Sequence, residues 1–162
     1  MDSAALLQTH AEVAIALAGF ASVIAALSRP LNAFERQRFL SLLGLAVIQI
    51  LGCLLPLWLV HGIESPAGAW RLLSFVLLAL NLSRMWWLVF QPTRKLSGSA
   101  RQVFNPIASR VIFGCGMLGF FCFALNAIGF AVAPGFDLYY SGMLSTLLVG
   151  FALFADVVTR ES

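Results

Sequence analysis

Hydrophobic residues along the chain gather in five long runs separated by short polar segments. The runs cover residues 5–27, 39–60, 70–90, 111–133 and 139–158. Each is about 20 residues long, the length that an α-helix needs to cross a bilayer core. A transmembrane β-barrel would instead show segments of about 10 residues that alternate between apolar and polar positions. The pattern predicts an all-α, multi-pass transmembrane helical bundle of five spans, with residues 1–162 as a single integral-membrane domain.

The first run leaves alternatives open. Because it contains His10 and Glu12, it could lie as an amphipathic N-terminal helix in the membrane interface, which would leave four spans. A cleaved signal peptide would begin with positive residues, whereas this chain has Asp2 and no Lys or Arg there. We therefore expect the first run to be retained, and favour five spans over four spans plus an interfacial helix.

Composition agrees with a membrane protein. The chain is 60% hydrophobic and 10% charged, whereas a soluble domain carries about 25% charged residues. The longest segment between runs, residues 91–110, is too short for an extramembrane domain. These numbers exclude a soluble enzyme fold.

Positive residues predict the orientation, because Lys and Arg near helix ends stay on the cytoplasmic side. They cluster in the first and third loops, and the second loop has only Arg71. The clustered residues are Arg29, Arg36, Arg38, Arg94, Lys95, Arg101 and Arg110. We expect the N-terminus outside, the C-terminus in the cytoplasm and a bacterial inner membrane as the location. The net charge of +3 is then a topology signal, and we expect no nucleic-acid partner.

Aromatic residues fit the same frame. Tryptophan and tyrosine are enriched at membrane interfaces, and several fall at the ends of runs: Trp58, Trp70, Tyr139 and Tyr140 at outer ends, Trp86 and Trp87 near an inner end. Pro56 lies inside the second run, where it should kink the helix. We expect the aromatic residues to form two interfacial belts.

Polar residues within the runs indicate where helices meet, because a polar side chain facing lipid would lack a hydrogen-bond partner. Gln49, Asn81, Arg84 and Asn126 are therefore expected to point into a polar core. Arg84 could instead extend to the headgroups, or pair with Asp156 at a similar depth in the fifth run.

Small residues in the fourth run predict a packing face. Spacings of four and three place six positions on one side of the helix: Cys115, Gly119, Cys122, Asn126, Gly129 and Ala133. Phe113, Phe120 and Phe123 fall off that face. Small residues let membrane helices approach closely, so this face should contact a neighbouring helix.

Candidate chemistry is sparse. Glu12 is the only acidic residue well inside a run, and intramembrane ionisable groups are functional candidates. His10 cannot pair with Glu12 along the helix, because residues two apart point to different sides. His10 and His61 could in principle ligate a haem, but two histidines are weak evidence. With no paired-cysteine or catalytic motif, we expect no enzyme, no metal site and no cofactor.

Two functions suit this sequence. The first is an accessory or scaffold bundle in the lipid bilayer that associates with itself, as a homo-oligomer, or with another membrane protein. The alternative is an oligomeric channel or transporter for small ions, with Glu12 near the outer mouth. Its pathway or polar core would draw on Glu12, His10, Gln49, Asn81, Arg84, Asn126 and Asp156.

Overall fold

The computed structural model describes residues 3–27, 33–59, 66–90, 106–129 and 135–158, which form five α-helices. The helices are α1 (Ser3–Leu27), α2 (Ala33–Leu59), α3 (Pro66–Phe90), α4 (Pro106–Ile128) and α5 (Gly135–Val158). The prediction of an all-α bundle is confirmed. Each predicted run lies within one helix, except that α4 ends at Ile128 and Gly129 forms a turn. Residues 60 and 130–133 of the second and fourth runs lie outside the described residues.

Helix ends follow from proline and glycine. Pro66 and Pro106 occupy the first positions of α3 and α4, where the missing amide hydrogen of proline costs nothing. Gly129 follows α4 with a φ of 75°, and its amide donates to the Asn126 carbonyl over 3.1 Å. Glycine adopts this left-handed conformation without strain and commonly ends helices. Pro56 lies inside α2, as expected.

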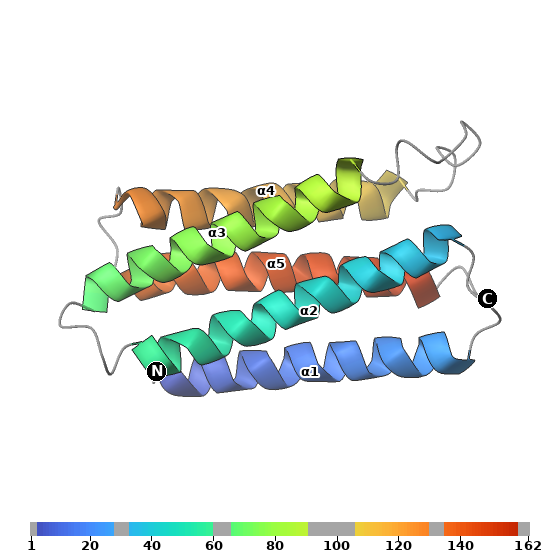
Figure 1. The fold of residues 1–162 in the computed structure, drawn as a ribbon, viewed down its shortest axis with the longest axis horizontal. Coiled ribbons are helices and arrows are strands. Elements are labelled where there is room, and N and C mark those ends of the chain that lie inside the picture. The colour runs from blue at the N-terminus through green and yellow to red at the C-terminus, as the bar shows by residue number, and fades with distance from the viewer. Residues whose placement is uncertain (1–2, 28–32, 60–65, 91–105, 130–134, 159–162) are drawn as a thin grey trace.

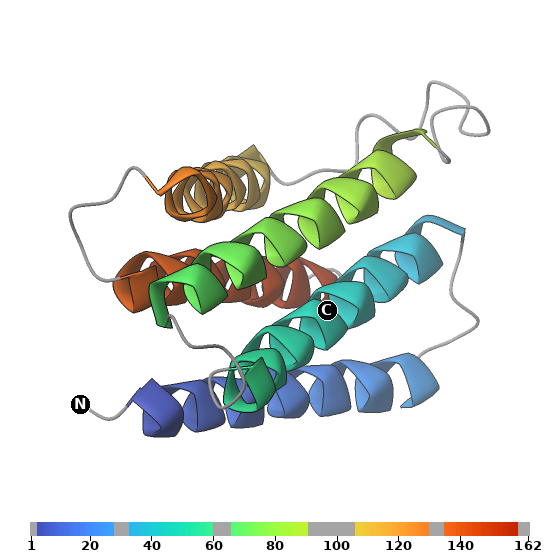
Figure 2. The same cartoon turned by 60° about the vertical axis from the view of Figure 1, so that its left-hand side comes forward.

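The helices alternate in direction, and α5 is the common packing partner (Figures 1 and 2). Along the chain α1 contacts α2, α2 contacts α3, and α3 contacts α4, while α5 contacts all four. Among the described residues no contact joins α1 to α4. The first four helices therefore wrap partly around α5 and leave one of its sides uncovered.

Four helices are long and apolar enough to cross a membrane. The candidate spans are Ser3–Ile24, Phe39–Pro56, Ser109–Ile128 and Gly135–Asp156. The chain is thus a multi-pass helical membrane protein. The first helix is among the four, although the alternative prediction placed it in the interface. Helix α3, which carries Arg71 and Arg84, is not among them, so a crossing by α3 stays a prediction.

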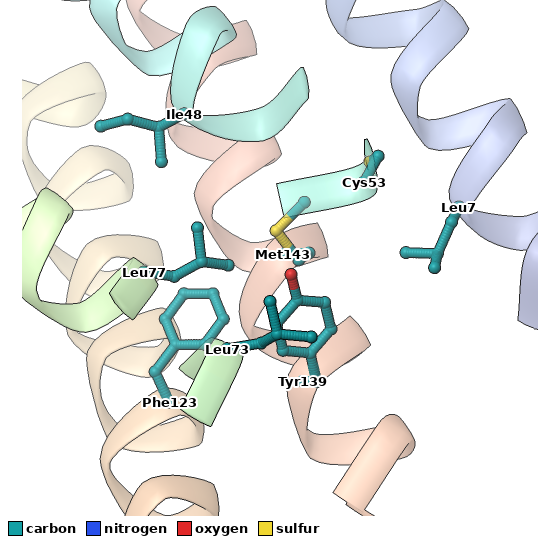
Figure 3. Packing of buried hydrophobic residues seen from close by; sticks show 8 residues of the cluster. All are labelled: Leu7, Ile48, Cys53, Leu73, Leu77, Phe123, Tyr139 and Met143. Carbon is teal, nitrogen blue, oxygen red and sulfur yellow. The ribbon is translucent and has the colours of Figure 1, made fainter. Parts of the chain in front are cut away.

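The bundle core contains a cluster around Tyr139 of α5 (Figure 3). The Tyr139 ring lies among Leu73, Met143 and Phe123, and its centroid is 6.1 Å from that of Phe123. Tyr139 is fully buried, so the prediction that it belongs to an interfacial belt is wrong. Trp58 and Trp86 are exposed, 87% and 66%, as a belt requires, whereas the Trp87 side chain lies outside the described residues.

Candidate functional site

A buried chain of hydrogen bonds joins α1, α2 and α5. His10 Nε2 lies 2.8 Å from Gln49 Oε1. The Gln49 amide nitrogen donates to the Met143 carbonyl over 3.3 Å and to the Thr146 hydroxyl. His10, Gln49 and Thr146 are at most 6% exposed. The three side chains therefore form one continuous contact, which we call the polar lock.

The polar lock fixes the histidine tautomer. A carbonyl oxygen can only accept hydrogen bonds, so the Gln49 nitrogen must face Met143 and its oxygen must face His10. Nε2 of His10 consequently carries the hydrogen and donates the hydrogen bond to Gln49 Oε1. The imidazole also meets the Tyr140 ring in a T-shaped contact, with centroids 5.8 Å apart. His10 is thus oriented by contacts to two helices.

Thr146 and Tyr139 are polar contributors that sequence reasoning missed. Thr146 also donates toward the Gly142 and Met143 carbonyls of its own helix, over 3.1 and 3.0 Å. The Tyr139 hydroxyl donates to the Gly52 carbonyl of α2 over 2.5 Å. The sequence did contain a signal for Thr146. It lies four residues from both Gly142 and Gly150, and small residues at this spacing mark a helix face that contacts another helix.

A second buried site surrounds Asn126 near the end of α4. Its amide nitrogen donates to Ser74 Oγ over 2.7 Å, to the Gly135 carbonyl over 2.8 Å and more weakly to the Trp70 carbonyl over 3.4 Å. These groups belong to α3 and to the first residue of α5. Asn126 is 2% exposed, so one side chain connects three helices.

Arg84 makes a third interhelical contact. Its Nη1 donates to the carbonyl oxygen of Ser41 over 3.3 Å and to the hydroxyl over 3.2 Å. The expected alternatives were an extension to the headgroups or an ion pair with Asp156. The described hydrogen bonds of the guanidinium go to α2, and they include none to Asp156, which is buried on α5, 4% exposed.

The predicted polar core is therefore divided into separate contacts. Gln49, Asn126 and Arg84 bind different partners, and the Asn81 amide donates to the Leu77 carbonyl of its own helix over 2.9 Å. Glu12 is exposed and accepts a hydrogen bond from Gln8 over 3.1 Å. Neither Asn81 nor Glu12 contributes a described hydrogen bond between helices.

The predicted face of α4 lies partly against α5. At Gly119 an added Cβ would lie 3.3 Å from the Gly142 carbonyl oxygen and 3.0 Å from Thr146 Cγ2. Cys115 and Cys122 are half-buried and unpaired with each other. Ala133 lies outside the described residues. Phe123, which the spacing set off this face, is 1% exposed, so the buried side of α4 is wider than predicted.

The polar contacts at these sites join helices to one another. Among the described residues no group of three histidine, cysteine or carboxylate side chains could hold a metal ion. His61, the second histidine of the haem hypothesis, lies outside the described residues. Comparison of the chain with protein-family models, curated proteins and solved structures finds no match. What the arrangement visibly does is hold helices together.

Proposed function

We propose that this protein is an accessory or scaffold subunit, a membrane bundle that acts by binding a second copy of itself or another membrane protein. The observation that carries the proposal is the uncovered side of α5. Its exposed residues follow alternating spacings of four and three over the whole helix: Asp137, Ser141, Leu144, Leu148, Phe151, Ala155 and Val158. This is the spacing with which one helix packs along another.

Burial of the polar groups supports the same function. The polar lock and the Asn126 site place amide, imidazole and hydroxyl groups in contact with one another inside the bundle. Such contacts set the register of helices. The groups offered outward by α5 are mainly apolar, with a single carboxylate, Asp137, in its first turn. A surface of this kind suits a helix of another membrane protein.

Site-specific photo-crosslinking tests the proposal. A photoreactive amino acid replaces Leu148 on the exposed side of α5, and a control replaces Phe113, which is 68% exposed on α4. In native membranes we expect a protein adduct from position 148 and only lipid adducts from position 113. Equal adducts from both positions, or lipid adducts alone from position 148, would contradict a binding surface on α5.

The ion-channel alternative rests on Glu12. Because Glu12 is exposed on α1, its carboxylate could line a pathway only between copies of the bundle. The variant Glu12→Gln keeps the shape of the side chain and removes its charge. If the protein conducts cations, reconstituted vesicles should show a flux that this substitution reduces. No flux from the unsubstituted protein would eliminate the channel and leave the scaffold.

The membrane orientation belongs to the same proposal. We infer five crossings, with the N-terminus outside and the C-terminus in the cytoplasm of a bacterial cell. The alternating helices of Figure 1 support this, because the ends of α1 and α3 that precede the Arg-rich segments lie on the same side of the bundle as the C-terminal end of α5. Fusions of a reporter enzyme after Val158 and before Ser3 would test it through their opposite accessibility.

A further inference from the structure

Arg84 uses only part of its hydrogen-bonding capacity. A guanidinium carries five N–H groups, and among the described residues Nη1 alone has acceptors, both on Ser41. The Nε group is buried with no hydrogen-bond partner, and no acceptor for Nη2 occurs among the described residues. Buried donors without acceptors are costly. Arg84 therefore keeps N–H groups that have no acceptor in the described part of the bundle.

The charge of Arg84 is also without a counter-charge in the described part of the chain. Its hydrogen bonds go to a neutral serine, and no described carboxylate lies within ion-pair distance of it. An isolated positive charge in a membrane helix is expensive unless an anion or water compensates it. Arg84 as a whole residue is only half-buried, although its Nε is enclosed, so a group from outside the bundle would have to approach its terminal nitrogens.

The depth of Arg84 in the membrane indicates which lipid groups lie near its guanidinium. Its partner Ser41 lies two residues after Phe39, where the candidate span Phe39–Pro56 begins. At 1.5 Å per residue the guanidinium is therefore about 3 Å along the helix axis from the end of that span. Lipid phosphates lie just outside the hydrocarbon core, within reach of a side chain at this level. On the proposed orientation this is the cytoplasmic leaflet, which carries the anionic lipids.

We propose that the phosphate of an anionic lipid headgroup binds Arg84 at the contact between α2 and α3. The free N–H groups of Arg84 would donate to phosphate oxygens, for which guanidinium geometry is well suited. The Ser41 hydroxyl accepts from Arg84 and finds no acceptor for its own proton among the described residues, so it supplies a second donor. This lipid site does not depend on the proposed scaffold role, but its place in the cytoplasmic leaflet rests on the proposed orientation.

Native mass spectrometry and thermal melting of the detergent-solubilised protein test the site. The probes are phosphatidylglycerol, phosphatidylcholine of the same acyl chains, diacylglycerol, and glycerol 3-phosphate as the headgroup without chains. We expect phosphatidylglycerol to bind and stabilise most. In Arg84→Gln its affinity should fall about five-fold, which corresponds to about 1 kcal/mol for one cation near a lipid surface.

Two further variants keep the test decisive. Arg36→Gln removes an exposed positive charge near the same end of α2 and should leave the preference for phosphatidylglycerol unchanged. Ser41→Ala keeps the charge of Arg84 and should weaken phosphatidylglycerol binding even if Arg84→Gln fails to fold. Unchanged binding in Ser41→Ala and Arg84→Gln, or an equal loss in Arg36→Gln, would overturn the site. Equal binding of glycerol 3-phosphate would overturn its assignment to lipid.

Discussion

The imidazole of His10 and the amide of Gln49 lie 2.8 Å apart although 39 positions separate them in the chain. His10 follows the start of α1 by seven residues, whereas Gln49 precedes the end of α2 by ten. The antiparallel course of the two helices brings these positions together. Because Gln49 also reaches Thr146, removing one amide should loosen three helices at once.

We expect Gln49→Leu to lower the free energy of unfolding by about 1–2 kcal/mol, because His10 and the Met143 carbonyl then lose a buried partner. Denaturation with sodium dodecyl sulfate measures this. The control Gln8→Leu removes an exposed amide whose hydrogen bond among the described residues goes to Glu12 of the same helix. Its effect should stay within about 0.5 kcal/mol. Equal effects would show that the lock adds no stability.

Asn126→Leu should be clearly more harmful than Asn81→Leu. The Asn126 amide reaches α3 and α5, whereas the Asn81 amide reaches only its own helix. Interhelical hydrogen bonds in membranes contribute about 0.6 kcal/mol on average and up to about 1.7, and Asn126 makes two short ones. Thermal melts in detergent should rank Asn126→Leu lower. A larger loss for Asn81→Leu would contradict the assigned contacts.

Tyr139→Phe should lower stability by about 1 kcal/mol, the typical contribution of one hydrogen bond. The variant keeps the buried ring of Figure 3 and removes only the hydroxyl that donates to Gly52. Tyr140→Phe is the matched control, because its hydroxyl has no hydrogen-bond partner in the described part of the chain. Chemical denaturation of both variants in the same detergent gives the difference. A loss of similar size in Tyr140→Phe would count against the Gly52 contact.

Two glycine substitutions separate crowded from open helix surface. A Cβ on Gly142 would lie 2.8 Å from the ring of Phe123, which is itself buried, so Gly142→Ala should cost about 1–3 kcal/mol through overpacking. At Gly114 nothing lies within 4 Å. Gly114→Ala should therefore be neutral, or stabilising by up to about 1 kcal/mol through helix propensity. Melting temperatures that fall equally would refute close packing of α4 on α5.

Much of the fold could be predicted because the length of an apolar run depends on local composition alone. Five runs gave five helices, and the proline and glycine positions explain where several of them end. The partners of buried polar residues depend on how helices are tilted and rotated against one another. Gln49 lies ten residues from the end of α2 and Asn126 two residues from the end of α4. In the described part of the chain no contact joins α2 to α4, so Gln49 binds α1 and α5 whereas Asn126 binds α3 and α5.

Tyr139 shows the limit of the interfacial rule. Its position near the start of α5 is typical of an aromatic belt, but rotation about the helix axis decides whether a ring faces lipid or protein. Here the ring faces the core, where the backbone carbonyl of Gly52 accepts a hydrogen bond from the Tyr139 hydroxyl. A carbonyl acceptor is present at every residue, so no side-chain pattern could have revealed this partner.

The contacts of α5 with all the other helices also have a consequence for biosynthesis. Since α5 follows them in the chain, it is the last of the five helices to be synthesised. Until then Gln49 lacks Thr146, Asn126 lacks the Gly135 carbonyl and Gly52 lacks Tyr139. The arrival of the last helix therefore completes three separate polar contacts that the earlier helices cannot make among themselves.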